Sequence, residues 1–300
     1  MPEPRMFLGL TVREAQVLAA ETLVLTEGEG AASDARRLLV FALGCEALDL
    51  IREPGRRLGE AEAIKFAGVL ERRRGGEPVS RIVGMRGFYG RDFVITPATL
   101  DPRPDSETLI TAALSLTSSK WPRGAGLDIL DIGTGSGCLL LTLLAELPEA
   151  RGVAVDPSVD ALAVARANAQ RLQVADRVSW VEGRIGAVAG GLGQRFSLMI
   201  SNPPYIPAGE IAGLQRDVCA FDPVLALDGG ADGLHLYREI AGVLGLLMVP
   251  GWVLFEVGDG QAVDVLGIVR DALPTGQILR TEVFPDMAGK QRCVAIEIHC

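Results

Sequence analysis

The sequence has few histidines and no closely paired cysteines, and both shortages limit the chemistry it can perform. His235 and His299 are the two histidines among 300 residues, which argues against a histidine-based metal site and against a Ser-His-Asp triad. The five cysteines are spread along the chain without a CxxC pair, a pattern typical of reduced thiols in a reducing compartment. We therefore expect a functional site without a metal.

Long apolar runs and basic segments are also missing. The run LGLLMVPGWVLF at residues 244–255 is broken by Pro250 and Gly251 and is shorter than the roughly 18–20 residues that a bilayer requires. The N-terminal MPEPRMFLGL lacks the basic start and long apolar core of a signal peptide. We therefore expect a cytoplasmic protein with no membrane partner.

The net charge of −9 is unevenly distributed. Residues 1–85 hold 12 basic against 13 acidic residues, and the remainder holds 17 against 25. Neither part has the excess of Lys and Arg that neutralises nucleic-acid phosphates. We therefore expect no direct nucleic-acid partner, and we expect a monomer.

Helical patterns fill the first 75 or so residues. TVREAQVLAAETLV opens with Thr11 and Glu14 in capping-box spacing. SDARRLLVFALG has a cap expected at Ser33 or Asp34 and a stop at Gly44, and EAEAIKFAGVLERRRGG ends in three arginines that suit a helix C-terminus. Aromatic and β-branched residues in RGFYGRDFVIT predict a short hairpin. The length and these patterns predict a helical domain at residues 1–80 and a hairpin linker at residues 81–105.

From residue 124 onward, β-rich runs alternate with helical runs. The β-rich runs are LDILDIG, RGVAVDP, VSWVEG, FSLMISNPP and GWVLFEVG, and their alternation with helices predicts a mostly parallel sheet covered on both faces. GQILRTEVFP and RCVAIEIHC lie too close together to hold a helix of useful length, so we expect antiparallel neighbours. The predicted fold class is α/β, with a Rossmann-like sheet whose last strand is antiparallel, at residues 106–300.

A glycine-rich loop follows the first predicted strand of this region. LDIGTGSGC places Gly133, Gly135 and Gly137 between a strand and a helix, where the backbone and helix N–H groups can approach a ligand. Asp156 ends the next strand and can accept both ribose hydroxyls of an adenosine cofactor. The spacing differs from the G-x-G-x-x-G of dinucleotide-binding proteins. With Asp131 two residues before Gly133, it has the S-adenosylmethionine pattern of Rossmann-like methyltransferases.

The segment SNPPYIP follows the fourth strand of this series, at the edge where open α/β sheets bind ligands. Pro203 and Pro204 have carbonyls but no N–H donors, and they are flanked by Asn202 and Tyr205. Asn202 Oδ1 and the Pro203 carbonyl can each accept one N–H of a planar NH2 group. Two fixed acceptors stabilise the positive charge that develops on such a nitrogen during methyl transfer, so no side-chain base is needed.

NPPY together with DIGTGSG resembles the amino-methyltransferases that act on planar nitrogen. Further stretches resemble the PrmC/HemK release factor glutamine methyltransferases. They are PVSRIVGMRGFYGRDFVIT, LDPRPDSETLI, FDPVLALDGGADGLHLYREI, FEVGDGQ and MAGKQRCVAI. The resemblance covers residues 77 to 300, and the helical domain also fits it. It implies methylation of the glutamine in the Gly-Gly-Gln motif of class 1 peptide chain release factors. Separately, we expect residues 1–80 to dock the release factor, because a tetrapeptide pocket offers little selectivity by itself.

The resemblance also implies roles for individual residues. Asn202 touches both ligands, and Pro203, Pro204 and Tyr205 line the glutamine pocket. Phe88, Arg103 and Glu107 belong to family-typical segments without a derived role. By the same resemblance, Gly133, Thr134, Gly135, Ser136, Gly137, Asp156 and Asn202 bind the cofactor. From the residues alone we also expect Asp131 and Arg184 to belong to the cofactor site.

The chain departs from the family pattern after its third strand, and two other functions stay open. Gly183 and Arg184 stand where the family often has an Asp and an aromatic residue beside the adenine; either Arg184 stacks on the ring or Glu182 contacts it. The alternative functions are a DNA adenine methyltransferase that uses the same NPPY site and a non-catalytic adaptor that binds S-adenosylmethionine.

Overall fold

The structure is a computed structural model that describes residues 6–27 and 30–299. Its contacts divide the chain into two units. The first holds the described residues up to Gly84 together with Gln215–Phe221, and the second holds Met85–Leu214 with the described residues from Asp222 onward. The division predicted at residues 80 and 105 stays a prediction. Over the described ranges, no helix combines the length and the apolar content that a membrane span needs.

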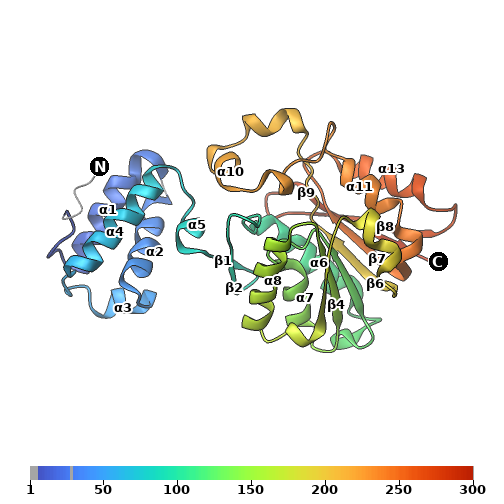
Figure 1. Cartoon of the computed structure of the whole chain (residues 1–300), viewed down its shortest axis with the longest axis horizontal. Coiled ribbons are helices and arrows are strands. Elements are labelled where there is room, and N and C mark those ends of the chain that lie inside the picture. Colours follow the sequence, from blue (N-terminus) through green and yellow to red (C-terminus); the bar gives the residue numbers. More distant parts are fainter. Residues whose placement is uncertain (1–5, 28–29, 300) are drawn as a thin grey trace. The chain divides into compact units, whose positions relative to one another are not determined.

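The first unit is helical, as the sequence predicted (Figure 1). The Thr11–Glu14 capping box forms: Glu14 accepts the Thr11 N–H at 2.8 Å, and Thr11 Oγ1 accepts the Glu14 N–H at 3.2 Å. The second helix starts at Ala31, earlier than the predicted cap, and Asp34 instead pairs with Arg73 at 2.8 Å. The helices are α1 (Val12–Glu27), α2 (Ala31–Leu43), α3 (Ala47–Arg52), α4 (Glu60–Arg74), α5 (Val79–Val83) and α10 (Arg216–Phe221).

The second unit begins with the predicted hairpin. Strands β1 (Met85–Phe88) and β2 (Arg91–Val94) are antiparallel. Tyr89 and Gly90 have φ values of 48° and 73°, and two positive φ values match the type I′ turn that suits a two-residue hairpin loop. The hairpin leads into the 3-10 turn η2 (Pro104–Ser106) and helix α6 (Glu107–Thr117).

A seven-stranded sheet forms the centre of the second unit. Its strands are β3 (Asp128–Ile132), β4 (Arg151–Asp156), β5 (Val178–Glu182), β6 (Phe196–Ser201), β7 (Met248–Glu256), β8 (Ile278–Pro285) and β9 (Gln291–Ile298). The order is β5-β4-β3-β6-β7-β9-β8. The first five strands in this order pair in parallel, and β9 is antiparallel to both of its neighbours. The predicted Rossmann-like sheet with a reversed last strand is confirmed.

Helices connect the strands. They are α7 (Cys138–Glu146), α8 (Val159–Arg171), α9 (Ile185–Val188), α11 (His235–Ala241), α12 (Leu244–Leu247) and α13 (Ala262–Ala272). The short 3-10 turns are η3 (Pro122–Gly124), η4 (Ala175–Arg177), η5 (Ala189–Gly191), η6 (Ala208–Gly213) and η7 (Val224–Ala226).

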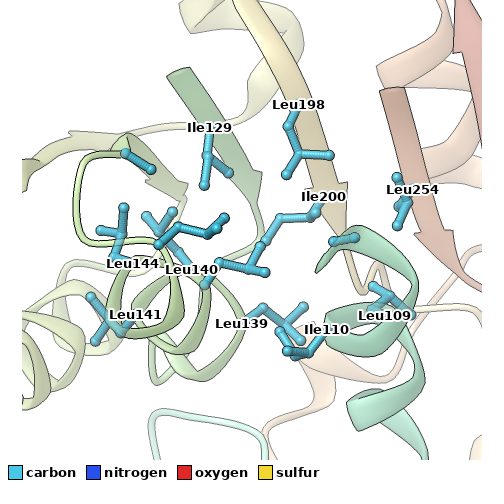
Figure 2. Packing of buried hydrophobic residues seen from close by; sticks show 14 of the residues in the cluster. Leu109, Ile110, Ile129, Leu139, Leu140, Leu141, Leu144, Leu198, Ile200 and Leu254 are labelled. Carbon is cyan, nitrogen blue, oxygen red and sulfur yellow. The ribbon is translucent and has the colours of Figure 1, made fainter. Parts of the chain in front are cut away.

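Two apolar cores cover the two faces of the sheet. On one face, Leu198 and Ile200 of β6 pack with residues of α6 and α7, such as Ile110 and Leu140 (Figure 2). On the other face, neighbouring strand residues such as Met199 pack with α11, α12 and α13. Because successive strand residues face opposite sides, both faces are buried and the carboxyl ends of the strands are left for a ligand.

Candidate functional site

A cavity of about 640 Å³ lies at the carboxyl ends of β3, β4, β5 and β6. It brings together eight of the predicted site residues: Gly133, Thr134, Gly135, Ser136, Asp156, Arg184, Asn202 and Pro204. Asp131, Gly137, Pro203 and Tyr205 are not part of its lining. Most of the other lining residues lie within residues 98–106, 157–161, 223–230 and 235–236.

The three glycines of the loop after β3 meet different surroundings. A Cβ at Gly133 would have no atom within 4 Å, and one at Gly135 would have only the Gly133 carbonyl oxygen, at 4.0 Å. A Cβ at Gly137 would lie 2.8 Å from Leu141 Cδ1 and 3.2 Å from Ala165 Cβ. Gly133 and Gly135 therefore leave space beside a cavity, whereas Gly137 allows close packing of α7 and α8.

Asp156 holds the loop and still has acceptor capacity. Its Oδ2 accepts the Gly135 N–H at 2.9 Å, and its Oδ1 accepts the Ser158 N–H at 2.8 Å. Burial raises the pKa of this carboxyl, and the two backbone hydrogen bonds oppose the rise. Each carboxylate oxygen retains a further lone pair, which suits the two hydroxyls of a ribose.

Asp131 lies beneath the loop and is fully buried. Its Oδ2 accepts the Thr134 hydroxyl at 2.7 Å, whereas its Oδ1 has no hydrogen-bond partner among the described residues. Burial raises the pKa of Asp131 to about 7. Its observed contact supports the loop through Thr134.

Asn168 of α8 was not singled out from the sequence, yet it connects the loop to the hairpin. Its Nδ2 donates to the carbonyls of Val94 and Ser136 at 3.0 and 2.9 Å, and its Oδ1 accepts the Val94 N–H at 2.8 Å. These partners lie 74 and 32 residues away. In the sequence, Asn168 is a single polar residue within a helical pattern, and nothing in that pattern indicates hydrogen bonds to Val94 or Ser136.

Asn202 follows β6 and has an oriented side chain. Its Nδ2 donates to Ser106 Oγ at 3.3 Å, and no described residue donates a hydrogen bond to its Oδ1. Glu256, at the end of β7, is a buried neighbour that the sequence reasoning missed. Burial raises the pKa of Glu256 to about 7, and the side chains of Ser106 and Asn202 are among the groups that oppose the rise.

The backbone after Asn202 is held by two other family-typical segments. Gln261 Nε2 donates to the Tyr205 carbonyl at 3.0 Å, and Gln261 Oε1 accepts the Gly258 N–H at 2.9 Å. A Cβ at Gly229 would lie 2.8 Å from the Pro204 carbonyl oxygen, and one at Gly233 would lie 2.3 Å from the Tyr205 carbonyl oxygen. The glycines of DGGADG therefore permit close approach of the NPPY backbone.

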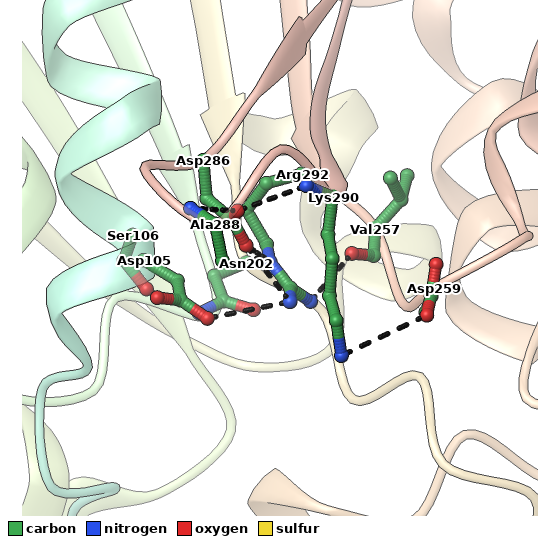
Figure 3. A network of polar contacts seen from close by, with 9 residues as sticks. All are labelled: Asp105, Ser106, Asn202, Val257, Asp259, Asp286, Ala288, Lys290 and Arg292. Atoms are coloured by element: carbon green, nitrogen blue, oxygen red, sulfur yellow. Dashed lines mark hydrogen bonds and ion pairs between the residues drawn. The ribbon is translucent and has the colours of Figure 1, made fainter.

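Arg292 of β9 makes polar contacts with segments next to Asn202 (Figure 3). Its Nη2 lies 3.3 Å from both Asp105 Oδ2 and Asp286 Oδ2, and its Nη1 donates to the Val257 carbonyl at 3.2 Å. This Arg comes from MAGKQRCVAI, a segment that the sequence associated with the family without assigning it a role. Arg292 therefore connects three segments by polar contacts: η2, the start of the loop after β7, and the turn between β8 and β9.

The structure also places the three residues that had no derived role. Phe88 is buried and packs edge-on against Phe93, with ring centroids 6.1 Å apart. Glu107 Oε1 accepts the N–H of Tyr89 at 2.7 Å, and Arg103 pairs with Asp222 at 2.5 Å. All three make structural contacts, and Arg103 also lines the cavity.

These features fit an adenosine cofactor with a short polar chain. The open side of Gly133 and Gly135 gives the ligand access to the backbone, and Asp156 offers acceptors for a ribose. Within the described ranges, no three His, Cys, Asp or Glu side chains form a group that could hold a metal ion. The sheet order, the glycine loop and the acid that ends β4 define a Rossmann-like methyltransferase.

Sequence comparison then gives the family. The PrmC N-terminal domain matches residues 14–84, and the methyltransferase small domain matches residues 111–215. A release factor glutamine methyltransferase of Bradyrhizobium diazoefficiens is 42% identical over 296 residues, covering 96% of this chain and 95% of that protein. One of Rhodospirillum rubrum is 43% identical over 262 residues, covering 87% and 77%. This chain belongs to the release factor glutamine methyltransferase family, as its motifs indicated.

A solved structure supports the fold independently. The hMettl16 catalytic domain in complex with a MAT2A 3'UTR hairpin is 14% identical, covers 80% of this chain and 82% of that chain, and has a TM-score of 0.53. At this identity the similarity concerns the fold alone.

Proposed function

We propose that this protein transfers a methyl group from S-adenosylmethionine to the side-chain amide nitrogen of the glutamine in the Gly-Gly-Gln motif of class 1 release factors. The observation that carries the proposal is the oriented amide of Asn202 beside the cavity, with Nδ2 bound to Ser106 and Oδ1 free to accept. Family membership supports the choice of substrate.

Gly133, Gly135 and Asp156 would hold the cofactor, whose sulfonium supplies an activated methyl group when it is bound. Asn202 Oδ1 and the Pro203 carbonyl would each accept one N–H of the substrate amide. They hold that nitrogen in place and stabilise its developing positive charge. The methylated, positively charged nitrogen would then lose one proton to solvent water, so no side chain would have to remove a proton beforehand.

The test uses a purified class 1 release factor and S-adenosylmethionine with a labelled methyl group. Mass spectrometry should find one methyl group on the glutamine of the Gly-Gly-Gln motif. Asn202→Ala should lower kcat by about 100-fold, as loss of one transition-state contact does, with cofactor affinity retained. Label that is absent from that glutamine would contradict the proposal.

The same assay separates the alternatives. Label on adenine after incubation with duplex DNA would favour the DNA enzyme. Cofactor binding without turnover on any of these substrates would favour the adaptor.

Residues 1–80 are proposed to dock the body of the release factor, because a pocket for one glutamine offers little selectivity by itself. Deleting them should weaken binding of the whole factor far more than binding of a short Gly-Gly-Gln peptide. Equal weakening of both would refute this role.

A further inference from the structure

The buried carboxyl of Glu256 has no part in the chemistry above, although it ends a strand beside the site. Strands β6 and β7 are parallel, and Ser201 pairs with Phe255. Asn202, which follows β6, and Glu256, which ends β7, therefore lie at the same edge of the sheet. Glu256 is 1% exposed, and its Oε2 has no hydrogen-bond partner among the described residues.

Ser106 is a hydrogen-bonding neighbour of both Asn202 and Glu256. Its Oγ accepts a hydrogen bond from Asn202 Nδ2 at 3.3 Å, so its own proton is available to another acceptor. Hydrogen bonding by Ser106, and less strongly by Asn202, lowers the pKa of Glu256 against the effect of burial. Both side chains therefore face this carboxyl.

We propose that Glu256 is a positioning residue that, through Ser106, keeps the Asn202 carboxamide turned with Oδ1 toward the substrate. The inference rests on the proposed function of the site. A carboxylate only accepts hydrogen bonds, so Ser106 donates to it and accepts from Asn202. With its proton directed to Glu256, Ser106 Oγ can only accept from Asn202, so Asn202 Nδ2 faces Ser106. Asn202 Oδ1 is then left to accept an N–H of the substrate NH2 group.

When Glu256 is protonated, it no longer fixes the orientation of the Asn202 carboxamide. A neutral carboxyl can donate to Ser106, and Ser106 can then donate to Asn202 Oδ1. The flipped amide would present N–H groups to a substrate nitrogen that also carries N–H groups. The competent orientation is therefore lost as the pH falls through the pKa of Glu256.

That pKa lies at about 7 because burial outweighs the groups that lower it. Arg292 of β9 lowers it and Asp105 of η2 raises it, in addition to Ser106 and Asn202. Four further titratable groups interact with the charge of Glu256, namely Tyr205, Tyr237, Cys138 and Cys293. Burial raises the pKa of each of these four groups, so they stay neutral near pH 7.

The test compares the wild type with Glu256→Gln in steady-state methylation across the pH range around 7. Wild-type kcat should fall about tenfold per pH unit on the acid side of the Glu256 pKa. In Glu256→Gln this acid limb should vanish, with kcat at pH 8 reduced by about fivefold or more. KM and cofactor Kd should stay within about twofold, because the residue touches neither ligand.

Stability separates positioning from a structural role. Gln removes a buried charge, so Glu256→Gln should be at least as resistant to denaturant at pH 8 as the wild type while being less active. Ser106→Ala should also lower kcat, Ser106→Thr should restore part of it, and Glu146→Gln at an exposed ion pair should change nothing. An unchanged kcat and pH profile in Glu256→Gln would overturn the proposal, as would parallel losses of stability and activity.

A direct observation keeps this test independent of the substrate. The Asn202 side-chain 15N signal of the wild type should shift with an ionisation near the Glu256 pKa, and the shift should be absent in Glu256→Gln. If no release factor is methylated but this shift is seen, the proposed function fails and the positioning role stands. A signal that does not respond to pH in the wild type refutes the positioning role.

Discussion

Arg103 Nη2 lies 2.5 Å from Oδ2 of Asp222, across 119 residues of chain. The second oxygen of Asp222 accepts the N–H of Asp101 at 3.2 Å, and the Asp222 side chain is almost fully buried. Residues 223–226, which line the cavity, follow directly. The ion pair therefore anchors one wall of the cavity.

Asp222→Asn should weaken the ion pair with Arg103 and loosen residues 223–226, which line the cavity. It leaves the partly exposed Arg103 without its counter-charge, so we expect a loss of about 1–3 kcal/mol in the free energy of unfolding. Cofactor affinity should fall about tenfold, as measured by calorimetric titration. Glu149→Gln, in the exposed pair with Arg123 at 2.8 Å, is the matched control and should have no effect. Equal effects of both substitutions would contradict the anchoring role.

Gly135→Ala should mainly lower cofactor affinity, whereas Gly137→Ala should mainly lower the stability of the fold. Both positions have positive φ, 56° and 81°, so each Ala is strained by about 1–2 kcal/mol. At Gly137 the Cβ also collides with Leu141, and the loss of stability should be larger, about 2–4 kcal/mol. Gly135→Ala should mainly weaken cofactor binding. Chemical denaturation and titration separate the two effects, and the reverse order would refute the assignment.

Asp131 should make stability depend on pH. Its pKa is about 7 in the folded chain because of burial and near 4 when unfolded, so the folded chain binds more protons between these values. The free energy of unfolding therefore falls as the pH rises through this window, and the penalty is complete above 7.

Asp131→Asn keeps an acceptor for Thr134 and removes this penalty. It should raise the free energy of unfolding at pH 8 by about 1–3 kcal/mol and should give no gain at pH 4. Denaturant titrations at both pH values provide the measurement. Asp128→Asn, at the partly exposed start of the same strand, is the control. A gain of equal size at both pH values would exclude ionisation as the cause.

Arg184 should contribute to adenine binding. It is exposed and lines the cavity, whereas Glu182 does not line it. Arg184→Ala should weaken cofactor binding about two- to fivefold, the range of an exposed cation–π contact. Arg184→Met keeps the apolar stem without the charge and should lose less. A larger loss in Glu182→Gln would favour the other adenine contact that the sequence left open.

The regular elements and the ligand-facing motifs could be predicted because their signals are local. Strand and helix periods gave the seven strands and the reversed β9, and NPPY and the glycine loop each lie in one short segment. The predicted cap of α2 was wrong by a few residues: the helix starts at Ala31, and the Asp34 side chain pairs with Arg73 of another helix. Local capping preference was outweighed by a tertiary contact.

The sequence by itself determined the sheet and the family, because hydrophobic period and short motifs do not depend on distant partners. Only the tertiary structure decided which polar side chains hold those motifs. Asn168, Ser106 and Asp222 make contacts across 32 to 121 residues of chain. Their importance comes from burial beside a specific partner, and the folded chain alone creates that burial.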